Sequence, residues 1–261
     1  LQFVERTVHD CIAAARQRLA DQPELQEKPG NLLEMLLTNQ SEHALSDAEI
    51  YGNVFTMLLA GEDTTANSLA WAAYYLSLHP EMVAKIRAEG HQVYGAGLVA
   101  ESQEQLAALT YTHAFVQEVF RLKPVSPQLL LEAAEDTVVQ QLHLPKGTRL
   151  LLQNQAAPNS SRYFSDPDQC IPERWLATDS CPIHHPEVIR TFGAGPRFCP
   201  GKYLATNEMV LLIAALCKRF DLELAGSPAE VRERLEFTMY PEGLGIVLRP
   251  VSERQDGPGA L

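Results

Sequence analysis

The sequence lacks an excess of basic residues and a paired cysteine pattern, and each absence argues against a class of protein. Lysine and arginine total 21 against 33 aspartate and glutamate residues, which leaves a net charge of −12. This balance speaks against a nucleic-acid partner. The five cysteines show no paired spacing, which predicts a reducing compartment rather than a disulfide framework.

Long apolar runs are lacking as well. No run reaches the length that a bilayer span needs, and no signal-peptide pattern is present. We therefore expect a cytoplasmic location. The first residue is Leu1 and not methionine, which is typical of a fragment. The sequence shows no internal repeat, and its hydrophobic content of 46% predicts a sizeable core.

One cysteine stands out because of the residues around it. Cys199 lies in a turn rich in glycine and proline, and the apolar-periodic run that follows predicts a helix over residues 203–220. Backbone N–H groups at a helix N-terminus favour the thiolate form of a nearby cysteine, and a thiolate is a soft ligand for haem iron. The alternative is a buried packing thiol, the role that we expect for Cys11, Cys170 and Cys217.

A second unusual segment lies inside a long predicted helix. Ser46 and Glu49 have the form of a capping box, and nothing breaks the helical pattern until His79-Pro80. We expect the middle of so long a helix to be buried. That middle contains Ala60-Gly61-Glu62-Asp63-Thr64-Thr65, and glycine and short polar side chains weaken a helix. Such residues at this place indicate a functional site, and the alternative is a polar stripe that faces solvent.

A third pattern is an acidic and a basic residue on the predicted helix 111–122. Glu118 and Arg121 lie three residues apart on one helix face, and Arg174 follows later in a Pro-Glu-Arg-Trp segment. An isolated pair of this kind is usually solvated and contributes little to stability. A buried carboxylate between two guanidinium groups would instead fix the orientation of the segments that carry them.

Together these segments resemble the cytochrome P-450 family. The pattern Phe192-x-x-Gly195-x-Arg197-x-Cys199-x-Gly201 matches the haem-binding loop of the family at all five characteristic positions. The segment 60–65 is similar to the oxygen-activation motif of the family. Glu118, Arg121 and Arg174 match its structural network, in which a Glu-x-x-Arg pair and a second arginine lock together beneath the haem loop.

The resemblance assigns a role to each matched residue of the first two motifs. It makes Cys199 the metal ligand of a heme b cofactor, and it makes Asp63 and Thr64 the catalytic pair that handles protons and dioxygen. The other cofactor-binding residues would shield the sulfur, pair with a haem propionate or allow close approach of the haem plane: Phe192, Arg197, Gly195, Gly201, Ala60 and Gly61.

The fold that the resemblance implies is mainly α with a small β-sheet, and it covers the C-terminal half only of the family's catalytic domain. We expect residues 1–261 to form a single partial domain, with a disordered tail at residues 251–261. Residues 136–144 and 148–152 are expected to be strands on either side of a Pro-Lys-Gly turn. Residues 241–245 are expected to form a hairpin tip that reaches the substrate pocket.

The implied function is a haem-thiolate monooxygenase that inserts one oxygen atom of dioxygen into a hydrophobic small-molecule substrate. The chain has no flavin or iron–sulfur motif, so electrons would come from a ferredoxin or a flavin reductase. Two alternatives stay open: a haem-thiolate peroxygenase or isomerase that needs no electron donor, and a catalytically silent, truncated fragment that binds haem or another protein. The missing N-terminal half of the domain would be a further partner, and activity of the isolated chain is a separate question.

Overall fold

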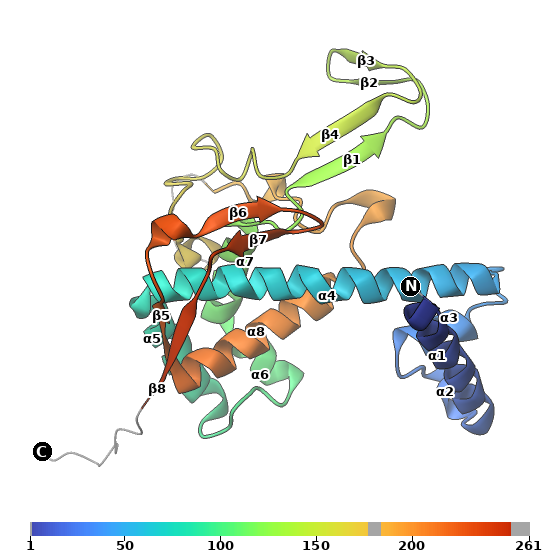
Figure 1. The fold of residues 1–261 in the computed structure, drawn as a ribbon, viewed down its shortest axis with the longest axis horizontal. Coiled ribbons are helices and arrows are strands. Elements are labelled where there is room, and N and C mark those ends of the chain that lie inside the picture. The colour runs from blue at the N-terminus through green and yellow to red at the C-terminus, as the bar shows by residue number, and fades with distance from the viewer. Residues whose placement is uncertain (1, 177–183, 252–261) are drawn as a thin grey trace, which may run out of the picture. The chain divides into compact units, whose positions relative to one another are not determined.

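The computed structural model describes residues 2–176 and 184–251, and the chain divides into two compact units, residues 1–63 and 64–261. Helices predominate and the strands form small antiparallel sheets, so the expected fold class, mainly α with minor β, is confirmed (Figure 1). Of the tail expected at residues 251–261, only Val251 lies inside the described residues. Within the described ranges, no helix is both long enough and apolar enough to cross a membrane.

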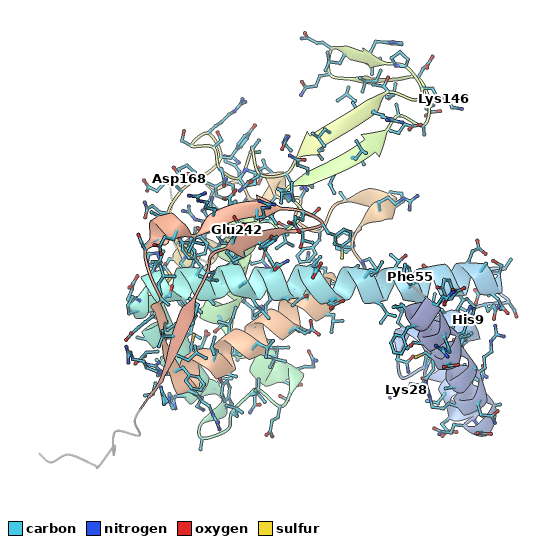
Figure 2. All side chains as sticks on the ribbon, in the orientation of Figure 1. His9, Lys28, Phe55, Lys146, Asp168 and Glu242 are labelled. Atoms are coloured by element: carbon cyan, nitrogen blue, oxygen red, sulfur yellow. The ribbon has the colours of Figure 1, made fainter. Side chains whose placement is uncertain are left out.

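The first unit is helical. It contains α1 (Gln2–Asp21), α2 (Glu24–Glu27), α3 (Leu32–Thr38) and the first half of α4 (Asp47–Leu78). Val8, Ile12 and Ile50 form its small buried core. The ring of Tyr51 stacks on His9 at a centroid distance of 4.9 Å and on Phe55 at 6.0 Å, which adds an aromatic column to that core. Figure 2 labels His9 and Phe55.

The second unit holds the larger core. Its helices are the remainder of α4, α5 (Pro80–Tyr94), α6 (Gln103–Ala108), α7 (Thr110–Leu122) and α8 (Lys202–Arg219), and its 3-10 turns are η1 (Pro172–Trp175), η2 (Pro186–Val188), η3 (Gly195–Arg197) and η4 (Pro228–Glu230). Side chains from α4, α5, α7 and α8 interlock in this core. Its most deeply buried members include Trp71, Leu76, Ile86, Phe115, Val119 and Ile213.

Helix α4 begins where the sequence predicts, but its middle is not buried. The N–H group of Ser46 donates to Glu49 Oε2 at 2.8 Å, and the N–H group of Glu49 donates to Ser46 Oγ at 3.2 Å, which completes the capping box. Residues 58–63, in contrast, are exposed. The expectation of a buried middle is wrong because the apolar neighbours that this chain supplies pack on α4 up to Phe55 and again from Leu69.

The first strands pair differently from the prediction. β1 (Gln128–Glu132) pairs with β4 (Arg149–Gln153), while β2 (Thr137–Val139) pairs with β3 (Leu142–Leu144). Residues 136–144 are therefore a hairpin rather than one strand, and Figure 1 shows this hairpin at the far end of the β1–β4 ladder. The chain reverses next to Gln140, whose φ of 55° lies in the left-handed region.

The last strands also correct a prediction. β5 (Phe220–Leu224) pairs with β8 (Ile246–Pro250), and β6 (Arg232–Leu235) pairs with β7 (Met239–Glu242). The hairpin tip is therefore residues 236–238, and residues 243–245 connect one sheet to the other. A β-carbon at Gly243 would lie 2.7 Å from the carbonyl oxygen of Glu230, so the connection passes close against η4.

Candidate functional site

The cysteine loop, residues 191–201, is closed by its own backbone. The N–H group of Cys199 donates to the Phe192 carbonyl at 2.9 Å, and the N–H group of Phe198 donates to the Gly195 carbonyl at 3.1 Å. Helix α8 starts at Lys202, directly after the loop. Cys199 is half-buried, whereas residues 194–198 are exposed. The thiol is thus held in place on a loop that presents its outer face to solvent.

Glycine is required by the backbone of this loop. Gly193 and Gly195 have φ values of 71° and 63°, in the left-handed region where a β-carbon is strained. A β-carbon built at Gly195 would meet no atom within 4 Å, so the space beside it is open. A β-carbon at Gly201 would lie 3.7 Å from Cys199 Sγ. Glycine at 195 and 201 therefore leaves both the open face and the sulfur uncovered.

The loop is fastened to helix α7. Thr191 Oγ1 donates to the Phe120 carbonyl at 3.2 Å. The rings of Phe192 and Phe120 meet edge to face, with centroids 5.1 Å apart and planes at 86°. Phe120 lies between Glu118 and Arg121 in the sequence, so the position of the loop depends on the helix that carries both.

The other described cysteines sit in different surroundings. Burial raises the pKa of Cys217 to about 12 and raises the pKa of Cys170 as well, so both thiols stay protonated. They are the packing residues that the sequence suggests. Cys11 is exposed, and the prediction that it packs in the core is wrong because it falls on the solvent face of α1.

Glu118 is the centre of a buried network. Arg121 donates to it twice, from Nε to Oε2 at 2.9 Å and from Nη2 to Oε1 at 2.8 Å. Arg174 Nε donates to Glu118 Oε1 at 2.9 Å. The three side chains are 0% exposed. The structure thus brings together the three residues that sequence reasoning assigns to a network, and the buried negative charge is neutralised from two segments far apart in the chain.

The two arginines also hold the loop that leads to η1. Arg121 Nη1 donates to the carbonyls of Pro158 and Pro167 at 2.9 and 2.7 Å, and Arg174 Nη1 donates to the carbonyl of Ser165 at 3.0 Å. Each guanidinium group therefore combines a charged partner with backbone acceptors of this loop.

Two further residues belong to the network, and no sequence pattern predicts their part in it. Trp175 Nε1 donates to Glu118 Oε2 at 2.8 Å, and the N–H group of Ile171 donates to Oε1 at 3.0 Å. Trp175 follows Arg174 directly, so its proximity was predictable but its bond was not. The Ile171 contribution comes from the backbone and leaves no trace in the side-chain pattern.

Helix α5 orients α7 and α8 through two charged side chains that no sequence pattern singles out. The Glu89 carboxylate accepts from the N–H groups of Tyr111 and Thr112 at 2.6 and 2.9 Å, which caps the positive end of α7. Arg87 donates to the Cys217 and Phe220 carbonyls at 2.7 and 2.9 Å, which caps the negative end of α8. Helix α5 is thus hydrogen-bonded both to α7, which carries Glu118, and to α8, which follows the cysteine loop.

The predicted oxygen-activation segment is helical throughout. Ala60, Gly61 and Asp63 are exposed and end the first unit, while half-buried Thr64 opens the second, to which Cys199 also belongs. A β-carbon at Gly61 would meet no atom within 4 Å. The Thr64 carbonyl accepts from Ser68 Oγ at 2.8 Å.

One turn further along α4, the helix is tied to the β6–β7 hairpin. Asn67 Nδ2 donates to Thr238 Oγ1 at 2.7 Å, so a side chain just past the segment holds the hairpin tip. The indole N–H group of Trp71 donates to the Met239 carbonyl at 3.3 Å. Sequence reasoning placed the tip elsewhere and therefore missed both bonds.

The residues of the loop fit a haem group. Cys199 offers a soft sulfur ligand, and the strained glycine backbone leaves open space beside Gly195 where a flat ring could approach. The exposed guanidinium group of Arg197 makes no hydrogen bond or ion pair with any described residue, so it is available to a carboxylate. A buried packing loop would not leave a cation and a thiol so placed.

Comparison with known proteins identifies relatives of the chain. The sequence model of the family named "Cytochrome P450" matches residues 1–248. The human mitochondrial 25-hydroxyvitamin D-1 alpha hydroxylase is 34% identical over 241 residues, which cover 92% of this chain and 46% of that protein. Carnosic acid synthase from Rosmarinus officinalis is 32% identical over 240 residues, covering 90% of this chain and 46% of that protein.

A solved structure agrees with these relatives. The crystal structure of a cytochrome P450, CYP102L1, superposes with a TM-score of 0.80 at 26% sequence identity and covers 96% of this chain and 56% of that chain. The chain therefore spans about half the length of the curated relatives that it matches.

Proposed function

The chain belongs to the cytochrome P450 family, and from that premise we propose that it is the C-terminal half of a haem-thiolate monooxygenase domain. Membership of the family implies haem iron with thiolate ligation. The single observation that carries the assignment to this chain is the placement of Cys199 on a closed glycine loop, half-exposed, directly before α8. The bound haem would supply the iron at which dioxygen is activated.

Several residues of the loop would hold the cofactor. Cys199 Sγ is the proposed iron ligand, and it lies on the loop directly before the first turn of α8. Arg197 would pair with a propionate, because its guanidinium group is exposed and has no partner among the described residues. Phe192, fixed by Phe120, would limit the access of water to the sulfur from the core side.

The α4 segment would handle protons. We assign Thr64 as the hydroxyl that hydrogen-bonds the reacting dioxygen, and Asp63 as the group that takes protons from solvent, in keeping with its exposed position. Ala60 and Gly61 carry little or no side chain, so they would let the haem plane lie close to the helix. These residues also favour the monooxygenase over a peroxygenase or isomerase, for which a proton relay toward dioxygen has no use.

The substrate class that the chain favours is a hydrophobic small molecule. The β6–β7 tip presents Phe237, which is 71% exposed, and the Asn67–Thr238 bond holds that tip at α4. The names of the relatives describe a hydroxylase and a synthase of organic compounds, in line with this class.

The proposed electron donor is a ferredoxin or a flavin reductase that docks near Arg197 and Lys202. The proposed location is the cytoplasm.

A second candidate function is that the isolated chain is a catalytically silent fragment. The β1–β4 ladder leaves apolar side chains in solvent, among them Leu130 at 73% and Leu151 at 54% exposure. Exposed apolar area of this kind marks a surface that another segment covers. The N-terminal half of the same domain is the proposed cover, so full activity is expected of the intact domain.

The deciding experiment is the exchange Cys199→Ser in the intact parent protein. The reduced protein with carbon monoxide should show the absorption band of thiolate-ligated haem before the exchange and lose it afterwards. A Cys170→Ser exchange is the matched control, since that thiol is buried in the core and should leave the band in place. Retention of the band and of turnover after Cys199→Ser would overturn the proposal. A chain that shows no haem absorbance at all would favour the silent fragment.

A further inference from the structure

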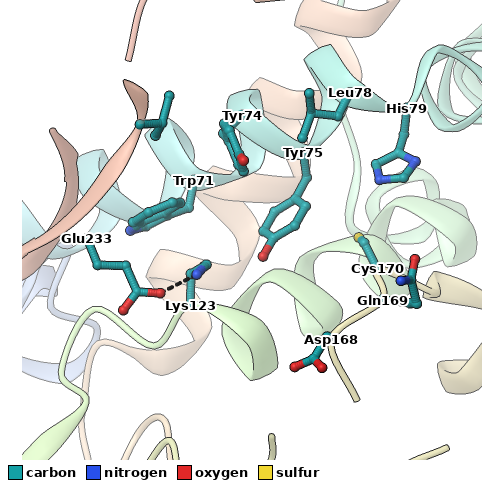
Figure 3. A pocket seen from close by; sticks show the side chains of 11 residues that line it. Trp71, Tyr74, Tyr75, Leu78, His79, Lys123, Asp168, Gln169, Cys170 and Glu233 are labelled. Atoms are coloured by element: carbon teal, nitrogen blue, oxygen red, sulfur yellow. Dashed lines mark hydrogen bonds and ion pairs between the residues drawn. The ribbon is translucent and has the colours of Figure 1, made fainter. Parts of the chain in front are cut away.

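A cavity of about 370 Å³ lies in the second unit, away from the cysteine loop. Figure 3 shows one wall made of Trp71, Tyr74 and Tyr75 from the last turns of α4, with Lys123, Asp168 and Glu233 across from them. No residue of the cysteine loop or of the α4 segment 60–65 lines it. Its volume is near the lower end of the range for small-molecule sites, about 300–1,000 Å³. The cavity is therefore a site of its own and suits a small ligand.

The aromatic wall attracts cations. The rings of Trp71 and Tyr74 meet at 5.8 Å and 87°, and those of Tyr74 and Tyr75 meet at 5.4 Å and 69°. Trp71 and Tyr75 are almost fully buried, so half-buried Tyr74 offers the ring face that a ligand in the cavity can reach. The structure already holds one ammonium group there, because Lys123 Nζ lies 4.9 Å from the centre of the Trp71 ring.

The charges of the lining do not cancel. Lys123 is paired with Glu233, and Figure 3 marks that contact. The carboxylate of Asp168, in contrast, makes no hydrogen bond or ion pair with any residue that the structure describes. The lining therefore keeps one uncompensated negative charge, in a chain whose net charge is −12. An anion is repelled from such a cavity and a cation is drawn to it.

The Tyr75 hydroxyl adds a neutral polar group to the aromatic wall. Burial raises the pKa of Tyr75, so the phenol keeps its proton at neutral pH. Its oxygen then contributes a neutral dipole beside a positively charged ligand and adds no negative charge of its own.

We propose that this cavity binds a small organic ammonium ion, with its charge beside Asp168 and its apolar body against Tyr74. The site lies apart from the residues proposed to hold haem, so the inference does not depend on the proposed function. Lys123 acts as an internal competitor, since its own ammonium group occupies part of the aromatic wall.

Isothermal titration of the full chain with benzyltrimethylammonium tests the proposal. The nitrogen of this probe has no lone pair, so it cannot coordinate haem iron. We expect saturable binding of one equivalent, and no such binding of benzyl alcohol or phenylacetate. Tighter or equal binding of the neutral or the anionic compound would overturn the inference, as would the absence of saturable binding.

Three variants sharpen the test through the sign of their effects. Asp168→Asn should weaken binding roughly three- to tenfold, because it removes the unpaired carboxylate. Asp166→Asn removes a carboxylate from the same exposed segment, outside the lining, and should leave binding unchanged. Lys123→Gln should tighten binding, since it removes the competing ammonium group and frees Glu233. Circular dichroism confirms that each variant is folded. Equal affinities of the Asp168→Asn variant and the unaltered chain would refute the site.

Discussion

The buried network and the cysteine loop lie side by side along α7 but satisfy their polar groups in opposite ways. Glu118 accepts five hydrogen bonds, and every donor belongs to this chain. The loop is held by backbone bonds, while Arg197 has no side-chain partner among the described residues and Phe198 is 41% exposed. The network is therefore a support that is complete without a ligand, whereas the loop keeps an exposed cation that a ligand can pair with.

The largest effect on folding is expected from the network. Glu118→Gln leaves two buried guanidinium groups without their carboxylate, and removal of one partner from a buried ion pair costs about 3–5 kcal/mol. Urea unfolding of the chain should show this loss as a lower transition midpoint. Glu187→Gln is the matched control, because its partner His185 is exposed and the pair contributes at most about 1 kcal/mol. Equal midpoints for the two variants would contradict the idea of a preformed support.

A smaller effect is expected where α5 caps α7. Glu89→Gln removes the charge that faces the first N–H groups of the helix, and loss of a cap typically costs about 0.5–2 kcal/mol. Hydrogen exchange should become faster at the amides of Tyr111 and Thr112 in particular. Glu81→Gln, in the first turn of α5 itself, should leave those amides unchanged. If exchange at 111 and 112 does not respond, Glu89 does not position the network helix.

Two glycines with equally open surroundings should respond with opposite sign. A β-carbon at either Gly195 or Gly61 would meet no atom within 4 Å, so the backbone alone decides. Gly195 has a φ of 63°, and Gly195→Ala should destabilise the chain by about 1–2 kcal/mol. Gly61 is helical, and Gly61→Ala should stabilise the chain by up to about 1 kcal/mol. Thermal unfolding of the haem-free chain measures both, and a loss of stability in both variants would show that loop strain is not the cause.

Sequence reasoning succeeded where the signal is local. The capping box fixed the start of α4, and Pro80 fixed its end, because both act through neighbouring residues. The spacing of Glu118 and Arg121 predicted one helix face, and the family resemblance supplied Arg174. Strand pairing failed because residues 129–131 are all leucine and show no alternation, so β1 was not recognised as the partner of β4.

The other features that the sequence did not predict concern burial and contacts between helices. The middle of α4 follows a helical pattern in the sequence, but burial requires a neighbour, and the chain supplies none for residues 58–63 among its described side chains. The caps by Glu89 and Arg87 join α5 to two other helices, and the Arg87 cap joins residues 130 positions apart. Interactions of this kind depend on the tertiary arrangement, and no local pattern reports them.

The smallest effect on folding and a selective effect on the cofactor are expected at Arg197. The side chain is exposed and has no described partner, so Arg197→Gln should change the free energy of unfolding of the haem-free chain by less than about 0.5 kcal/mol. A hydrogen bond to a charged group is worth about 1.5–3 kcal/mol, so the same exchange should weaken haem retention about tenfold or more.

Arg190→Gln is the control for this prediction. Arg190 already donates to the carbonyls of Glu187 and Ile189, so its exchange should not affect haem retention. Transfer of haem to an apo-globin acceptor measures retention without turnover. A large loss of folding stability with unchanged haem retention would show that Arg197 supports the fold, as the Glu118 network does. The distinction between that network and the cysteine loop would then be wrong.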